Sequence, residues 1–347
     1  MSISIVIPVT RISEIRICLE NLVNSFQQAH ALNYEILVIK DPQCDLDFPL
    51  IKEHSCIRIL NCESMHPSIR RNYGVRHASN QIIAFIDDDV YVPQEWAKNV
   101  LKYIPNCDGI CGPIIQSRFK SALKNIVGLA QESFFSEGFN DRRNFRDQTR
   151  FFDIPLCNVV IHRKIWDAVH GFNEVADYNV DDCEFFFLAE KKGFKFFNEP
   201  GLAVEHDLLP LGWAFFRKKA QQRFKGGINS IIFKEIYFTY TSVRIVWLSY
   251  IILFLLLTIQ FVFPFNMIQF LKNVTGVYGT AALGISLTKA KNHPLLALML
   301  PFVFFLIHLV DYFSYTFGVF YYFIFRNQFR YVTEHKKKRM AFYATEI

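Results

Sequence analysis

Short apolar runs alternate with longer one-sided amphipathic segments over the first 90 residues of the chain. The apolar runs have the length of buried strands, and the segments between them have the spacing of amphipathic helices. We expect strands at 3–9, 34–39, 57–60 and 81–86, and helices at 12–29 and 67–78. This order predicts an α/β fold with a doubly wound, mostly parallel sheet. Ligands of such sheets bind beyond the carboxyl ends of the strands.

The next part of the chain is less regular. Residues 105–150 mix charged and apolar positions without a clear period, and 151–162 is expected to form a pair of strands. A helix is expected at 182–192, where Gly193 would end it. Short strands at 194–197 and 202–204 then lead to His206. Residues 1–210 are therefore expected to form one domain.

Three apolar segments follow this domain. Residues 246–265 are long enough for one membrane span, 274–287 are too short to cross comfortably, and 295–325 exceed what one span needs. As a single helix the last segment would be about 46 Å long, so it must tilt, kink or fold back. We expect transmembrane helices within 246–325, and the role of the middle segment stays open.

Asp311 lies inside the last apolar segment, with His308 one helical turn before it. An acid within a membrane is costly and usually functional. The alternative is that the segment folds back and Asp311 marks a solvated bend.

Basic residues flank the apolar block on both sides. Residues 211–245 hold seven Lys or Arg against one acid, and 326–347 hold six against two. Such charge favours anionic lipid headgroups, so we expect a membrane-proximal segment at 211–245 and a cytoplasmic tail at 326–347. The positive-inside rule places both on the cytoplasmic face, which predicts an even number of crossings. We exclude nucleic acid as a partner because the basic residues are concentrated next to the apolar segments, where lipid headgroups would lie.

The eight cysteines are scattered without Cys-x-x-Cys spacing. This argues against a zinc site and is typical of free thiols in a reducing compartment. The N-terminus has neither a basic leader nor an apolar run of signal-peptide length. We therefore expect a cytoplasmic catalytic domain held at the inner or plasma membrane.

The strongest chemical signal is the run Asp87-Asp88-Asp89, which directly follows an expected strand. Three adjacent carboxylates repel one another unless a cation lies between them. Mg²⁺ and Mn²⁺ prefer oxygen ligands and are commonly held by one or two carboxylates together with substrate phosphates. The alternative is an acidic turn in which Asp89 caps the next helix.

A second acidic group, Asp181, Asp182 and Glu184, lies at the start of a predicted helix. A base that deprotonates a sugar hydroxyl must be a group such as a carboxylate within hydrogen-bond reach of it. Acids also favour helix N-termini because of the helix dipole, which is the structural alternative. Between the two acidic groups, Arg70 and Arg71 lie in the first turn of another predicted helix, where a diphosphate could bind.

Taken in order, these segments resemble the family 2 glycosyltransferases. The matching residues are Ser4-Ile-Val-Ile-Pro8, Asp41 after a strand, Arg71-Asn72 with Gly74, Phe85-Ile-Asp-Asp-Asp89, Gly171-Phe172-Asn173-Glu174, and Asp181-Asp182 followed by Gly193. The resemblance covers about residues 3–206. It implies the GT-A fold, a nucleotide-diphosphate sugar as donor, and Mg²⁺ or Mn²⁺ as cofactor.

The resemblance also implies roles for single residues, with Asp182 as the catalytic base. Nucleotide-sugar contacts would come from Pro8, Asp41, Arg71, Asp87 and Asp88, and metal ligands from Asp87, Asp89 and His206. On the acceptor side we expect Asp181, Glu184 and Arg223. The chain departs from the family pattern at Lys40-Asp41-Pro42, which replaces an acid-rich turn, and it lacks the Gln-x-x-Arg-Trp element of processive members.

These residues together predict a membrane-anchored, inverting transferase that acts on a glycan or lipid-linked acceptor in cell-surface polysaccharide biosynthesis. Polyprenyl phosphate is an alternative acceptor. A nucleotidyltransferase would need a Gly-rich basic loop after the first strand, but Pro8-Val-Thr-Arg-Ile-Ser has no glycine. An inactive membrane scaffold would keep its function when Asp89 or Asp182 is replaced by Asn.

Overall fold

The computed structural model divides into two compact units, which we describe separately. Unit 1 comprises Met1–Ile115, Arg142–Asp207 and Lys337–Ile347, and unit 2 comprises Gln116–Asp141 and Leu208–Lys336. Within these ranges the structure describes residues 2–10, 12–30, 33–46, 49–115, 121–131, 133, 148–151, 154–175, 180–206, 209–237, 247–252, 255, 256, 258, 266–290 and 294–345.

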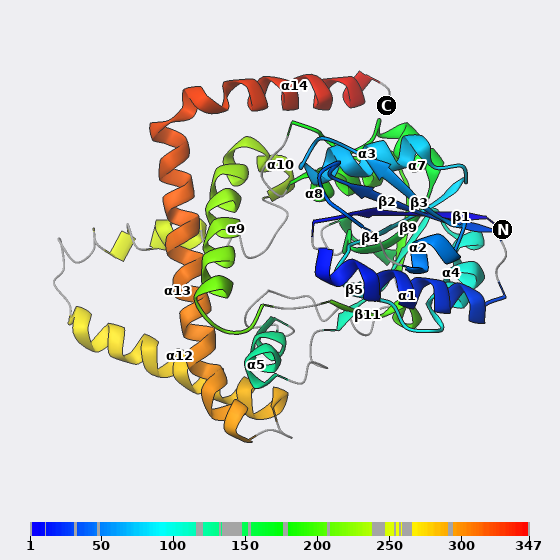
Figure 1. Cartoon of the computed structure of the whole chain (residues 1–347). Coiled ribbons are helices and arrows are strands. Elements are labelled where there is room, and N and C mark those ends of the chain that lie inside the picture. The colour runs from blue at the N-terminus through cyan, green and yellow to red at the C-terminus, as the bar shows by residue number, and fades with distance from the viewer. Residues whose placement is uncertain are drawn as a thin grey trace. The chain divides into compact units, whose positions relative to one another are not determined.

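An eight-stranded sheet forms the centre of unit 1 (Figure 1). Its order is β3-β2-β1-β4-β9-β6-β10-β8. The strands are β1 (Ile3–Pro8), β2 (Tyr34–Lys40), β3 (Ile57–Asn61), β4 (Ile82–Ile86), β6 (Gly109–Cys111), β8 (Gln148–Thr149), β9 (Asn158–His162) and β10 (Phe196–Asn198). Neighbours β3, β2, β1 and β4 run parallel, β6 pairs parallel with β10, and β9 lies antiparallel between β4 and β6. The predicted mixed α/β fold with a mostly parallel sheet is confirmed.

Helices cover both faces of this sheet, which is why its central strands are mostly apolar. Every residue of β1 and β4 is buried. One face is covered by α1 (Ile12–Gln28) and α4 (Trp96–Tyr103), and the other by α3 (Pro67–His77), α7 (Arg163–Ala168) and α8 (Asp181–Lys191) (Figure 1). Short elements complete the domain: α2 (Pro49–Glu53), η1 (Ile104–Asn106) and η3 (Pro200–Leu202).

The strands and helices expected before residue 90 are present, each with ends within one residue of those predicted. The strand pair expected at 151–162 is wrong. Residues 155–158 form a turn in which the Asn158 amide donates to the Pro155 carbonyl, and β9 begins only there. Within the described residues its partners are β4 and β6, which are distant in sequence, and not a strand next to it in the chain.

A small second sheet brings His206 to the end of β4. It has the order β5-β11-β7, with β5 (Val90–Tyr91), β11 (Val204–His206) and β7 (Ile114–Ile115). His206 lies opposite Val90 in the antiparallel register. Since Val90 follows the three aspartates directly, this pairing places the imidazole beside them.

Unit 2 is helical and is built around one long apolar helix. Its elements are α5 (Ala122–Gln131), α9 (Trp213–Ile232), α10 (Lys234–Tyr237), α12 (Met267–Lys289), α13 (Pro294–Ile324) and η4 (Arg326–Phe329). The helix α13 packs against α9, α12 and α5. The chain then continues into α14 (Arg330–Thr345), whose last part belongs to unit 1.

Among the described residues, α13 is the one helix long and apolar enough to cross a membrane. It runs without interruption for 31 residues, so the last apolar segment does not fold back and Asp311 does not mark a bend. The middle segment, 274–287, lies inside the longer α12. Most of the span expected at 246–265 lies outside the described residues, and that prediction stays open.

Candidate active site

Arg71 joins the two acidic groups of unit 1. From the buried face of α3, one guanidinium nitrogen lies 2.9 Å from Oδ1 of Asp87, and another lies 3.6 Å from Oδ2 of Asp181. The hydroxyl of Ser68, one turn earlier, donates to the same Asp181 oxygen at 2.6 Å. Burial alone would lower the pKa of Arg71, but the carboxylates of Asp87 and Asp181 outweigh it and raise that pKa. Arg71 therefore stays charged and holds the acids together.

The three aspartates after β4 point to different partners. Asp87 pairs with Arg71, and Asp89 lies 3.3 Å from Nε2 of His206. Asp88 accepts hydrogen bonds from the backbone amide and the hydroxyl of Thr10, which follows β1. Asp88 thus ties the end of β4 to the end of β1, and its predicted contact with the donor stays a prediction.

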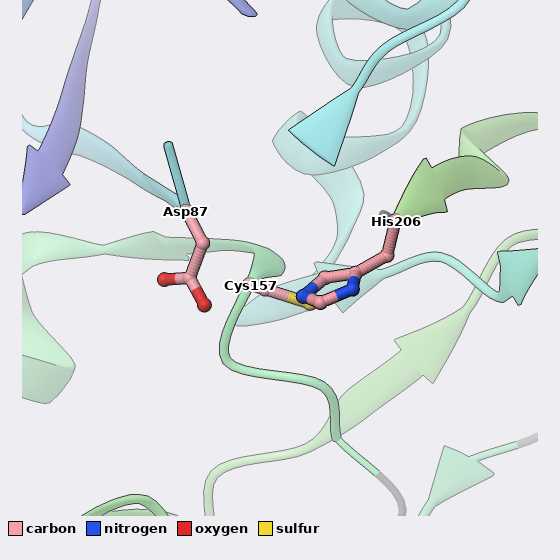
Figure 2. Close-up of side chains that lie close together, drawn as sticks. All are labelled: Asp87, Cys157 and His206. Atoms are coloured by element: carbon pink, nitrogen blue, oxygen red, sulfur yellow. The ribbon is translucent and has the colours of Figure 1, made fainter. Parts of the chain in front are cut away.

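A metal-capable group lies at this end of the sheet. Asp87, Cys157 and His206 each offer a ligand atom, and these atoms lie within 4.8 Å of one another. Figure 2 shows a ring nitrogen of His206 next to the sulfur of Cys157, and the carboxylate of Asp87 to the left of both. The Nδ1 atom of His206 is buried and has no hydrogen-bond partner among the described residues.

These donors suit a divalent cation. Carboxylates are the ligands that Mg²⁺ and Mn²⁺ prefer, and imidazole binds many first-row metals. A thiol is a softer ligand, which widens the range of ions that the group could accept. Cys157 did not emerge from the sequence, because no cysteine pair has metal-binding spacing and its neighbours Asp87 and His206 are far away in the chain.

Asp182 begins α8 and is the predicted base. Its carboxylate accepts the amide of Cys183 at 2.7 Å. Burial, followed by repulsion from Asp181, raises the pKa of Asp182 from 3.8 to about 6. A carboxylate with such a pKa is ionised at neutral pH yet is a better proton acceptor than an ordinary Asp.

The turn that follows α7, at 170–173, is organised by Asn72, the residue after Arg71. Its side-chain amide donates to the carbonyl of Phe172 at 2.9 Å, and its Oδ1 accepts from the amide of Phe172 at 2.9 Å. Gly171 has a φ of +72°, and a Cβ there would lie 2.6 Å from Oδ1 of Asn72. Of these two neighbouring residues, Arg71 therefore contacts the carboxylates of Asp87 and Asp181, and Asn72 contacts the turn at 170–173.

Glu184, which we expected on the acceptor side, lies in the interior of unit 1. Its side chain is fully buried and accepts a hydrogen bond from Asn173 at 2.6 Å. Position 184 of the helix faces the interior of unit 1, whereas Asp181 and Asp182 are partly exposed. Its predicted contact with the acceptor stays a prediction.

The remaining predicted residues lie at strand ends or in unit 2. Pro8 ends β1, and Asp41 follows β2. Asp41 caps a turn by accepting the amide of Gln43 at 2.8 Å and lies 4.0 Å from the buried Arg70. Arg223 belongs to α9, where its guanidinium lies 3.0 Å from Asp311 of α13.

Comparisons with known proteins concern the family and the fold of the chain. Residues 4–169 match the family model "Glycosyl transferase family 2". No curated protein sequence matches the chain. Among solved structures, the mannosyltransferase PcManGT from Pyrobaculum calidifontis, in complex with GDP-Man and Mn²⁺, has a TM-score of 0.56 at 13% identity, covering 89% of this chain and 86% of that one. TarS from S. aureus, solved as residues 1–349, has a TM-score of 0.44 at 12% identity, covering 93% of this chain and 91% of that one.

Proposed function

Because residues 4–169 place this chain in glycosyl transferase family 2, with the GT-A fold, we propose that it transfers a sugar from a nucleotide-diphosphate donor to a hydroxyl or phosphate acceptor with inversion of the anomeric centre. One observation carries the proposal: Arg71 holds Asp87 and Asp181 together, so the two acidic groups of the chain share one site. A cation-binding group and a raised-pKa carboxylate then lie within one small region of unit 1.

The donor's diphosphate is proposed to bind at the end of β4. Asp87, Asp89 and His206 would hold Mg²⁺ or Mn²⁺, with Cys157 beside them. When bound there, the ion supplies positive charge that neutralises the leaving diphosphate. Arg71 contributes further positive charge at the same place, since the pKa of its guanidinium is raised. The neighbour PcManGT, which is described with GDP-Man and Mn²⁺, supports a donor and an ion of this kind.

An acceptor hydroxyl is proposed to lose its proton to Asp182, whereas a phosphate acceptor would attack as the anion. Direct attack by the acceptor oxygen on the anomeric carbon breaks the bond to the diphosphate and inverts the configuration. Asp181 does not serve as this base in our proposal, because Ser68 and Arg71 occupy one of its oxygens. The raised pKa of Asp182 suits it to take the proton as the new bond forms.

We propose that the chain is anchored to a membrane through α13 and acts on acceptors that are lipid-linked or belong to a growing surface glycan. The length and apolar character of α13 support the anchor. The basic residues on both sides of the apolar block, in 211–245 and 326–347, support contact with anionic lipid headgroups. We also propose four parts for the chain in a membrane: the catalytic domain at 1–210, the basic membrane-proximal segment at 211–245, the transmembrane helices within 246–325 and the basic tail at 326–347.

The test is a panel of nucleotide sugars scored by release of nucleoside diphosphate, with and without Mn²⁺. We expect one donor to be used and turnover to require the ion. Asp89→Asn and Asp182→Asn should each abolish release, whereas a scaffold would keep its cellular function in both variants. Release that is unaffected by a chelator would contradict the metal site, and full-length protein that fractionates as soluble without detergent would contradict the anchor.

A further inference from the structure

The C-terminal helix α14 contributes a side chain to the domain that contains the candidate base. Arg339 donates to the carbonyl of Val169 at 3.1 Å and to the carbonyl of Gly171. Its Nε lies 3.4 Å from Oε1 of Glu184. The side chain of Arg339 is only 14% exposed, so these contacts are largely shielded from water.

Glu184 needs such a partner. Its side chain is 1% exposed, and a buried carboxylate is strongly unfavourable unless a cation and hydrogen bonds compensate it. Asn173 donates to one of its oxygens at 2.6 Å, and Arg339 lies against the other. The ion pair thus joins the C-terminal helix to the first turn of α8.

Glu184 lies two residues after Asp182 in that turn. A helix turn is stiff, so a contact that fixes Glu184 also fixes the backbone that carries Asp182. The turn at 169–173, whose Asn173 bonds to Glu184, is held from a second direction, because Asn72 of α3 bonds to Phe172 while Arg339 bonds to Val169 and Gly171. The start of α8 is therefore held from two elements that are distant in sequence.

We propose that Arg339 is a positioning residue: through Glu184 and the carbonyls of Val169 and Gly171 it holds the start of α8, and with it Asp182, where the acceptor's proton is taken. This inference rests on the proposed function. It assigns the basic C-terminal stretch, which the charge pattern connected only with lipid, a second role inside the catalytic domain. The helix that carries Arg339 follows the apolar helix α13 with only η4 between them.

The test compares Arg339→Gln and Arg339→Lys with Arg330→Gln in the full-length chain. Arg330 is a matched control, because it lies on the same helix and pairs with Glu334 at 2.8 Å but is 82% exposed. We expect Arg339→Gln to lower kcat by about 10- to 100-fold, as a misplaced catalytic group does, with the KM for the donor nearly unchanged. Arg339→Lys should recover part of the loss because it keeps the charge opposite Glu184 but not the two-carbonyl geometry. Arg330→Gln should resemble the wild type.

Rescue gives a second criterion. In the double variant Arg339→Gln with Glu184→Gln, two amides face each other without a buried charge, and we expect kcat above that of the single Arg339→Gln variant. A loss of kcat equal in Arg339→Gln and Arg330→Gln would overturn the proposal, as would wild-type kcat in Arg339→Gln.

Amide hydrogen exchange separates this inference from the proposed function. We expect faster exchange at residues 180–184 and 169–173 in Arg339→Gln and no change in Arg330→Gln, a result that needs no turnover. If the wild type transfers no sugar, the proposed function fails, whereas the exchange data still report whether Arg339 holds α8. Unchanged exchange in Arg339→Gln would overturn the inference whatever the activity.

Discussion

The guanidinium of Arg71 lies 2.9 Å from the carboxylate of Asp87, although one residue belongs to a helix and the other follows a strand. This pair is the centre of the candidate site, because the same guanidinium lies 3.6 Å from Asp181 on a third element. A buried Arg between two carboxylates neutralises charge that would otherwise have to be balanced from outside. It also brings the metal-capable group and the predicted base into one region.

Replacing Arg71 by Gln is expected to lower kcat/KM for the donor by about 100-fold or more, since it removes a preorganised cation from a diphosphate site. Breaking the buried pair should also reduce the free energy of unfolding by about 3 kcal/mol. Arg76→Gln is the matched control, because Arg76 lies on the same helix and is half exposed, 3.6 Å from Glu174. Steady-state kinetics of both variants measure the change in kcat/KM, and thermal unfolding measures the change in stability. Full activity in Arg71→Gln would contradict the proposed role.

The raised pKa of Asp182 predicts the pH dependence of transfer. The base must be ionised, so kcat/KM for the acceptor should rise with pH through about 6 and level off above it. Asp182→Asn should lose activity by about 10²- to 10⁴-fold at pH 8. If kcat/KM for the acceptor did not rise with pH around 6, another group would take the proton.

The same shift predicts a stability effect with a definite sign. Because the folded-state pKa lies above the ordinary value of 3.8, ionisation of Asp182 destabilises the native state, fully above pH 6 and progressively less as the pH falls toward 4. Asp182→Asn should therefore raise the free energy of unfolding by on the order of 1–3 kcal/mol at pH 8 and by less at pH 5. Thermal unfolding at the two pH values measures the difference. A variant that is destabilised equally at both pH values would contradict the raised pKa of Asp182.

His206 should set the affinity for the cation. His206→Gln is expected to raise the Mn²⁺ concentration for half-maximal activity by about tenfold or more, because the imidazole beside Asp89 is lost. Glu205→Gln is the control, since the side chain of the preceding strand residue points to the opposite face. Titration of chelator-treated enzyme with Mn²⁺ provides the measurement. Equal titration curves for the two variants would exclude His206 from the metal site.

The contact between α9 and α13 depends on two glycines. A Cβ at Gly227 would overlap the carbonyl oxygen of Tyr315, and one at Gly318 would overlap that of Phe224, whereas a Cβ at Gly226 would lie 3.9 Å from the Tyr315 ring. We expect Gly227→Ala and Gly318→Ala each to cost about 1–3 kcal/mol of stability. Gly226→Ala should be close to neutral. Unfolding in detergent that shows the same loss for Gly226→Ala as for Gly227→Ala would contradict this packing.

The sequence by itself determined the α/β alternation up to residue 90, and it identified both acidic groups and the apolar block. These are local properties: an apolar run followed by acids marks a strand end, and a period of 3.6 marks a helix, whatever the rest of the chain does. The ordered series from Pro8 to Asp182 carried the family resemblance for the same reason. The strand pair at 151–162 failed because β9 pairs with β4 and β6, and no local pattern contains that choice.

Only the tertiary structure decided which side chains meet. Glu184 and Asp182 stand in one acidic run, yet Glu184 is buried against Arg339 while Asp182 is partly exposed. Cys157 joins Asp87 and His206 through strand pairings that the chain's local order does not encode. Burial and pairing of charges depend on the low-dielectric interior that forms when distant segments pack. For that reason the sequence predicted most of the residues of the site, whereas their contacts and burial could be read only from the structure.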